Sequence, residues 1–339
     1  MIVIGRDFDP IWKLAPVLLL ESCKRKRLSH NYLLRFGRLL VYLLACAALP
    51  ECLDFAMVQS LAIVCERCGG KVQRIPLTRD VRGQLVILGT GTSVGVPTIG
   101  CGCEVCQSDD PRNKRTRCGL AIGLEHGNLL IDTPPDLRQQ LLREGLGVAS
   151  AVLFTHEHAD HIFGLDDLRI FQFYLGQPLP LFCEESVEAR IRQSFDYAFI
   201  DREQTHAGSV PQLVFKRITC APFEIMGQLF TPIRLKHGPR FDVLGFRFGN
   251  IAYCTDTNHI PPESLSLLEG LDVLILDALR HRPHVTHFSL DEAVEVARQL
   301  KPKRTLFTHI SHELDHAITN ASLPHGMELA YDGQQIPLT

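Results

Sequence analysis

The sequence lacks several features that would assign it at once to a broad class of protein. Its 339 residues carry a formal net charge of −3, so there is no overall basic field and general nucleic-acid binding is not expected. No internal repeat or low-complexity tract occurs. The apolar run at residues 39–50, LLVYLLACAALP, is too short to span a bilayer and lies too far along the chain for an export signal. We therefore expect neither a membrane partner nor a stable nucleic-acid partner.

The twelve cysteines do not form the framework of a small secreted disulfide protein, because they are scattered along a long chain. They indicate a reducing cytoplasm, in which some thiols bind metal and the others are small core residues. With 45% hydrophobic and 22% charged residues, the chain can bury a full core.

The first eighty residues lack the regular alternation of strand-like and helical segments that marks the rest of the chain. They contain the basic run at residues 24–27 and a CERC motif at residues 65–68, which resembles half of a zinc ribbon but has no second half. We predict a poorly packed N-terminal extension over residues 1–80, with translation beginning nearer Met57 or Val81, and a hydrolase domain over residues 81–339. A chain that starts at residue 82 should then fold and be active.

From Gln84 onward, short apolar strands alternate with helical segments, which predicts an α/β fold. The predicted strands are QLVILG, NLLID, SAVLFT, TPIRLK, NIAYCT, VLILD and RTLFT. The predicted helices cover residues 134–144, 186–195, 262–269 and 289–300, each with Pro or Ser at its start.

The segment THEHADH at residues 155–161 directly follows one of these strands. A tight loop after a strand can bring several side chains to one point. Here His156, His158, Asp160 and His161 alternate ligand types that suit two adjacent metal ions, with zinc or manganese as candidates.

Further ligand types stand at the ends of later strands. His237 follows TPIRLK, Asp256 follows NIAYCT and His309 follows RTLFT. Active sites of α/β folds gather at the carboxyl ends of strands, so the joint placement of these three residues favours a shared metal site.

This set of residues, in type and order, resembles the metallo-β-lactamase fold superfamily over about residues 84–339. The resemblance implies an αββα sandwich with a two-metal site along one edge of the paired sheets. It assigns His156, His158 and His237 to one metal, Asp160, His161 and His309 to the other, and Asp256 to a bridging position.

A second motif, GCGCEVC, follows a glycine-rich turn and could supply three thiolates to one structural zinc. His312 lies three residues past His309, and we expect it to point away from the catalytic metals toward this loop. The pattern is similar to the phosphoribosyl cyclic phosphodiesterase branch of the superfamily. That resemblance implies a Cys₃His site of Cys101, Cys103, Cys106 and His312.

The same branch carries an active-site histidine at the position of His287, just before the predicted helix cap Ser289. A histidine there could protonate a leaving oxygen or bind a phosphate, whereas the alternative is an exposed loop histidine. His281 and His284 match no ligand position. We therefore name His287 and the metal-binding Asp160 as the catalytic residues.

The function implied is a cytoplasmic, binuclear metal-dependent phosphodiesterase for a small cyclic phosphodiester such as phosphoribosyl 1,2-cyclic phosphate. Two divalent metals can supply a hydroxide nucleophile and neutralise charge that develops on the phosphate. The alternatives are hydrolysis of a thioester, a lactone or an RNA 3′ end, or a role in quinone-cofactor biosynthesis, where relatives share a CxCxxC loop. A homodimer is compatible with this interpretation.

Overall fold

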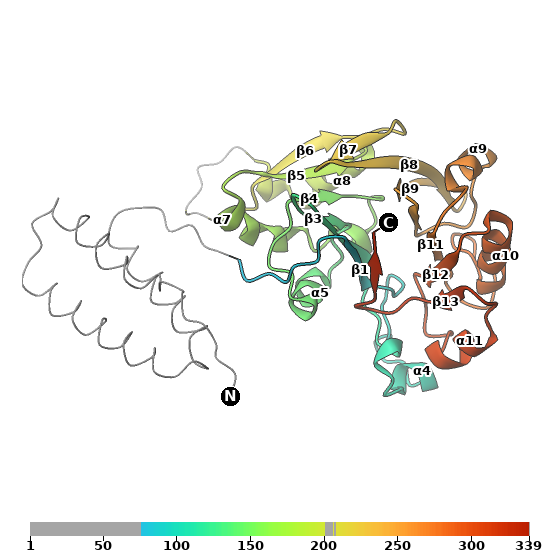
Figure 1. Ribbon diagram of the computed structural model, residues 1–339. Helices are drawn as coiled ribbons and strands as arrows, with labels where there is room; N and C mark the ends of the chain where they lie inside the picture. The colour runs from blue at the N-terminus through green and yellow to red at the C-terminus, as the bar shows by residue number, and fades with distance from the viewer. Residues whose placement is uncertain (1–75, 201–205, 207, 339) are drawn as a thin grey trace, which may run out of the picture. The chain divides into compact units, whose positions relative to one another are not determined.

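A computed structural model describes residues 76–200, 206 and 208–338, which belong to one compact unit of the chain (Figure 1). The basic run, the apolar run and the CERC motif all lie outside the described residues. The predictions made for them therefore stay predictions.

Within the described residues the strands form two seven-stranded sheets, ordered β14-β1-β2-β3-β4-β5-β6 and β13-β12-β11-β10-β9-β8-β7. The strands of the first sheet are β1 (Gln84–Gly89), β2 (Gly119–Leu124), β3 (Gly127–Ile131), β4 (Ala151–Leu153), β5 (Leu179–Cys183), β6 (Leu213–Arg217) and β14 (Gln335–Pro337). The strands of the second are β7 (Phe223–Ile225), β8 (Gln228–His237), β9 (Phe241–Phe248), β10 (Ile251–Cys254), β11 (Val273–Asp277), β12 (Arg304–Thr308) and β13 (Met327–Leu329).

Short helices connect the strands. The α-helices are α4 (Glu104–Gln107), α5 (Leu137–Glu144), α6 (Ala159–Ile162), α7 (Gln172–Leu175), α8 (Glu185–Ser194), α9 (Pro262–Leu265), α10 (Leu290–Leu300) and α11 (His316–Ser322). The 3₁₀ helices are η4 (Pro111–Asn113), η5 (Leu165–Phe171), η6 (Asp196–Ala198) and η7 (Ser266–Leu268). Across the described part of the chain, no helix is both long enough and apolar enough to cross a bilayer.

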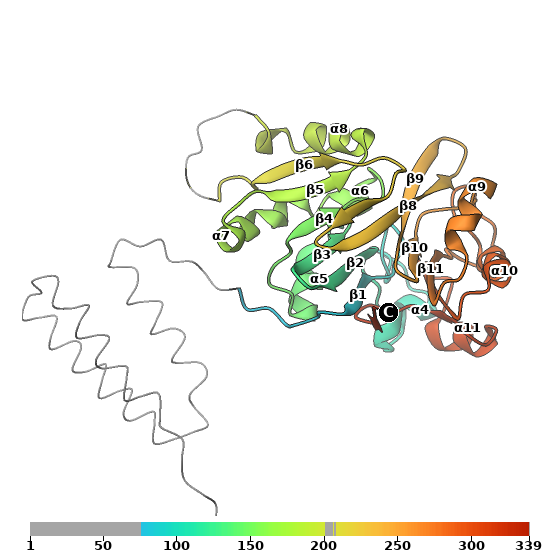
Figure 2. The same cartoon turned by 45° about the horizontal axis from the view of Figure 1, so that its top comes forward.

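The central strands of each sheet, such as β1, β2, β10 and β11, are buried on both faces, which explains why they read as continuous apolar runs. In β1, Leu85 and Ile87 face the core between the sheets, whereas Val86 and Leu88 pack against the helices of the first layer. In the second sheet, the buried side chains of β11 divide in the same way between the central core and the helices α9 and α10. Figures 1 and 2 show α5, α7 and α8 beside the first sheet and α9, α10 and α11 beside the second. The predicted αββα sandwich is confirmed.

All seven predicted strands are present, and the additional strands β2, β5, β6, β7, β9, β13 and β14 complete the sheets. Two helix starts differ from the prediction. The N-cap of α8 is Glu184 rather than Ser186, and α5 begins at Leu137 instead of at residue 134. The cap at Ser289 is as predicted, and there a reciprocal hydrogen-bonded capping box with Glu292 fixes the start of α10.

Val81 is only 3% exposed and packs in the first helical layer, and the backbone N–H of Arg79 donates to Gly145. A chain that starts at residue 82 would therefore lack a side chain of the core. The packing favours a truncation before residue 76.

Strand direction brings the candidate site residues to one edge. β3 and β4 are parallel neighbours, and so are β10, β11 and β12. β8 and β10 both pair antiparallel with β9 and thus run in the same direction. The carboxyl ends of these strands carry the polar residues that follow.

Candidate metal centre

The first group of candidate ligands consists of His156, His158 and His237. Their ligand atoms lie within 4.8 Å of one another, and the Nε2 atom of His156 is 3.0 Å from the Nδ1 atom of His158. His156 and His158 come from the loop between β4 and α6, and His237 is the last residue of β8. The strand ends thus bring together two segments about eighty residues apart in sequence.

Hydrogen bonds orient two of these rings. The Nδ1 atom of His156 is 2.9 Å from the hydroxyl of Thr155, and the Nδ1 atom of His237 donates to the carbonyl of Thr286 at 2.8 Å. The other ring nitrogen of each therefore faces the group, as expected for a metal-binding histidine whose tautomer is set by its outer partner.

The second group consists of Asp160, His161, Asp256 and His309, again within 4.8 Å of one another. The Nε2 atom of His161 is 3.2 Å from Asp256 Oδ2 and 3.4 Å from Asp160 Oδ2. The Nε2 atom of His309 is 3.2 Å from Asp256 Oδ1. This oxygen also lies 4.0 Å from His156 Nε2, so the Asp256 carboxylate stands between the two groups.

The second group has the features of a cation site. Within the described residues, the Nε2 atoms of His161 and His309 are buried but have no hydrogen-bond partner, although carboxylates lie beside both. Burial opposes a charge on His309, yet the neighbouring carboxylate of Asp256 raises its pKa to about 9. Burial also opposes a charge on His161, but the carboxylates of Asp256, Asp160 and Asp132 raise its pKa well above its usual value. A buried site that stabilises positive charge this strongly fits a divalent cation, which would displace protons on binding.

The backbone at this edge adopts an unusual conformation. Asp132, Asp256 and His309 have φ angles of 65°, 54° and 59°, in the left-handed region that residues other than glycine rarely occupy. Each follows the end of a strand: β3, β10 and β12 respectively. Such strained residues cluster at functional sites, where the surrounding structure holds them in place.

Two carboxylates of this edge were not among the predicted site residues. Asp132 is fully buried and accepts from His161 Nδ1 at 2.8 Å and from the Thr155 backbone N–H at 2.8 Å. Asp277 accepts from His287 Nδ1 at 2.7 Å. Both end an apolar strand run, NLLID and VLILD, so the signal that singled out Asp256 could also have identified them.

His287 is 8% exposed, which contradicts the alternative of an exposed loop histidine. Its ring stacks on that of His309 at 4.4 Å and lies 4.7 Å from that of His237. Because its Nδ1 donates to Asp277, its Nε2 is left for the site. His281 is exposed and His284 is half-buried, and neither belongs to a metal-binding group of the described residues.

The loop cysteines gather separately. Cys101, Cys103, Cys106 and His312 place their ligand atoms within 4.8 Å of one another. The Nδ1 atom of His312 is 3.2 Å from the sulfur of Cys101 and 3.3 Å from that of Cys103, close to the roughly 3.5 Å that separates neighbouring ligands of tetrahedral zinc. His312 lies in a turn rather than on a helix, so it faces the loop as expected but not for the helical reason.

The thiols differ in their ionisation. The backbone N–H of Cys106, together with the ring of His312, lowers the pKa of the Cys103 thiol to about 6, which favours the thiolate that binds metal. Burial raises the pKa of Cys106 to about 11. Zinc binding at neutral pH would therefore release the proton of Cys106.

Comparisons with known proteins agree with this geometry. Residues 127–310 match the family model described as a beta-lactamase superfamily domain. A crystal structure of a new diphosphatase from the PhnP family is 44% identical, with a TM-score of 0.70, covering 75% of this chain and 96% of that one. Zinc-bound PqqB from Methylobacterium extorquens is 21% identical, with a TM-score of 0.61 over 75% of this chain and all of that one, and shares the fold.

A protein of Porphyromonas gingivalis named octanoyltransferase is 36% identical over 251 residues, which are 73% of this chain but only 50% of that protein. The chain thus spans half the length of this curated relative. The family match over residues 127–310 covers the strands and loops that carry the two histidine groups. The chain belongs to the beta-lactamase superfamily, with the metallo-β-lactamase fold, and it resembles the PhnP branch of that superfamily.

Proposed function

We propose that the protein is a binuclear metal-dependent phosphodiesterase that acts on a small cyclic phosphodiester. The observation that carries the proposal is the convergence of seven ligand-type side chains into two adjacent groups that share Asp256. His156, His158 and His237 would hold one divalent metal, Asp160, His161 and His309 the other, and Asp256 would bridge them. Zinc and manganese both suit this mixed imidazole and carboxylate set.

When bound, such a metal pair supplies a nucleophile at neutral pH and charge stabilisation for an in-line displacement at phosphorus. The protein's own contribution is orientation and proton transfer. Asp132 and Thr155 fix the rings of His161 and His156, so that their ring nitrogens face inward. Asp277 holds His287 with Nε2 toward the site, where it can donate a proton to the leaving oxygen.

The test is a substrate comparison with zinc-loaded and manganese-loaded protein. We expect turnover of bis(p-nitrophenyl) phosphate, with p-nitrophenyl phosphate and a chromogenic β-lactam as poor substrates. Faster turnover of a thioester than of any phosphodiester would refute the assignment of substrate class and leave the fold unaffected.

A second candidate is a diphosphatase, favoured by the 44% identity to the diphosphatase of the PhnP family. The two reactions are related, because the reacting phosphorus of a substituted diphosphate also carries two bridging oxygens. Parallel assays with ribose 1,2-cyclic phosphate esters and with substituted diphosphates distinguish them. A role in quinone-cofactor synthesis without hydrolysis is less well supported, since loss of a catalytic ligand would favour it and all seven candidate ligand residues are present.

We further propose that Cys101, Cys103, Cys106 and His312 hold a separate structural zinc. The variant Cys103→Ser should then reduce the metal content from about three ions per chain by one. The expected loss of stability is on the order of 4 kcal/mol, as for other lost structural metals, or a fall in Tm of roughly 8–16 °C.

The measurements are elemental analysis of the purified protein and a thermal melt. Cys220→Ser is the matched control, because Cys220 is an exposed thiol outside the cluster. Full metal content and an unchanged melt in Cys103→Ser would rule out the structural zinc.

A further inference from the structure

A cavity borders the candidate metal centre on the side of the turn between β8 and β9. It has a volume of about 650 Å³ and is lined by Glu157, Ser186, Lys236, Gly238, Pro239, Arg240, Phe241 and Asp242. In the sequence, Glu157 lies between the candidate ligands His156 and His158, and Gly238 directly follows His237. The cavity therefore opens beside the first histidine group.

Phe241 links the cavity to the metal centre. Its ring lies 5.0 Å from the ring of His158, in an edge-to-face arrangement, and 6.3 Å from that of His237. Yet 42% of this large apolar side chain is exposed. An exposed aromatic ring beside a reaction centre offers a face on which a planar group can stack.

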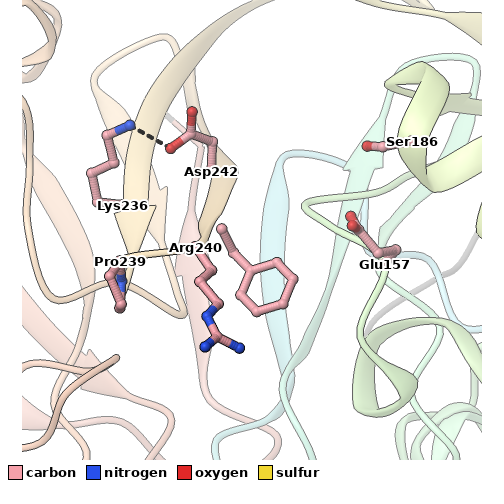
Figure 3. A pocket seen from close by; sticks show the side chains of 8 residues that line it. Glu157, Ser186, Lys236, Pro239, Arg240 and Asp242 are labelled. Carbon is pink, nitrogen blue, oxygen red and sulfur yellow. Dashed lines mark hydrogen bonds and ion pairs between the residues drawn. The ribbon is translucent and has the colours of Figure 1, made fainter.

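Arg240 contributes a positive charge to the cavity that no described side chain pairs with. In the described part of the chain its guanidinium has no hydrogen-bond or ion-pair partner, whereas neighbouring Lys236 is engaged with Asp242 at 2.6 Å. A free guanidinium matches the geometry of a phosphate, which it can bind through two parallel hydrogen bonds. Figure 3 shows Arg240 on one side of the cavity, with Glu157 and Ser186 on the other.

The opposite wall has a different chemistry. Glu157 is half-buried and offers carboxylate oxygens, and Ser186 is exposed and offers a hydroxyl. A carboxylate repels phosphate but accepts hydrogen bonds from sugar hydroxyls or from an amino group. The two walls would therefore receive different parts of a ligand: an anion at Arg240 and hydroxyl or amino groups at Glu157.

The turn that carries Arg240 is held firmly at its base. The backbone N–H of Gly238 donates to Asn258 at 2.8 Å, and the side chain of Asn258 donates to the carbonyl of Val285. Gly238 has a φ of 71°, and a Cβ atom there would approach Thr286 to 2.6 Å. These contacts attach the wall to the segment just before His287 and so fix the position of the cavity relative to the candidate metal centre.

We propose that this cavity is a substrate subsite for a nucleoside diphosphate group, with the second phosphate bound by Arg240 and the base stacked on Phe241. The inference rests on the second candidate of the proposed function, the diphosphatase, because a substituted diphosphate carries a second phosphate beside the reacting phosphorus. An exposed arginine in a hairpin turn is ordinary by itself. Here a free guanidinium, an exposed aromatic ring and a hydrogen-bonding wall line one cavity beside the metal centre.

The test is calorimetric binding of adenosine diphosphate and adenosine monophosphate to zinc-loaded protein, which needs no turnover. Arg240→Ala should weaken diphosphate binding by about 10- to 150-fold, the scale of hydrogen bonds to a charged group, and monophosphate binding by much less. Arg240→Lys should recover only part of the loss, because it keeps the charge without the bidentate geometry. Arg190→Ala, an exposed arginine of α8, is the matched control.

Phe241→Ala should weaken both nucleotides by about 5- to 150-fold, and Phe241→Tyr should restore them, because tyrosine retains the stacking face. Zinc content is measured for every variant, so that a disturbed His158 is recognised.

Equal losses on the two nucleotides in Arg240→Ala, or no loss, would overturn the subsite. Absence of phosphodiester turnover by the wild type, together with Arg240-dependent diphosphate binding, would refute the proposed reaction but support the subsite.

Discussion

His309→Ala should reduce phosphodiester turnover by more than about 10³-fold, because the loss of a metal removes several kcal/mol of charge stabilisation in the transition state. His309 comes from the end of β12 and lies 3.2 Å from the shared carboxylate of Asp256. Its replacement leaves only Asp160, His161 and Asp256 for the second metal. We therefore expect one fewer metal ion per chain, with the Cys₃His group unaffected.

The measurement combines kcat for bis(p-nitrophenyl) phosphate with metal analysis of the same sample. His325→Ala is the matched control, since His325 is an exposed histidine that belongs to no metal-binding group of the described residues. A His309→Ala variant that keeps its full metal content and wild-type turnover would disprove the two-metal assignment.

His287→Ala should lower kcat by about 10²- to 10⁴-fold for a substrate whose leaving group is an alkoxide, the usual scale of general acid catalysis. The loss should shrink for p-nitrophenolate, because this leaving group hardly needs a proton. His287 can play this part because Asp277 fixes its ring over His309 and leaves Nε2 toward the site. Both metals should remain bound.

Two further variants test the interpretation. Asp277→Asn should show a similar but smaller dependence on the leaving group, since it disturbs the orientation of His287 and not its presence. His281→Ala, an exposed neighbour, should have no effect. If His287→Ala slows both substrates equally, the residue binds substrate and does not act as the acid.

The strands that carry the site were predictable because they contain apolar runs and end in a polar residue; β10 and β12 are buried on both faces, whereas β8 is buried mainly on one. That pattern identified His237, Asp256 and His309, which lie far apart in sequence but meet at one edge. Strands β6, β7 and β9 were missed for the opposite reason. They are less uniformly buried, so their apolar residues form no continuous run.

The remaining features depend on tertiary contacts that no local pattern encodes. The run NLLID marks Asp132 as a carboxylate at a strand end, but its orienting role depends on its left-handed backbone and its bond to His161, which the run does not show. The cavity beside Phe241 exists only because the β8–β9 turn is tied through Asn258 to the segment before His287. Sequence spacing indicated the ligand types but could not give their orienting partners.

The order of the candidate metal ligands along the chain has a consequence for biosynthesis. Each group joins an early segment to a late one: Cys101 must wait for His312, and Asp160 for His309. The first sheet is likewise completed only when β14 pairs with β1. On the ribosome, a nascent chain would display thiols and imidazoles long before their partners are synthesised. Since a metal site forms together with the fold, we expect each of these sites to close only after its late segment has been synthesised.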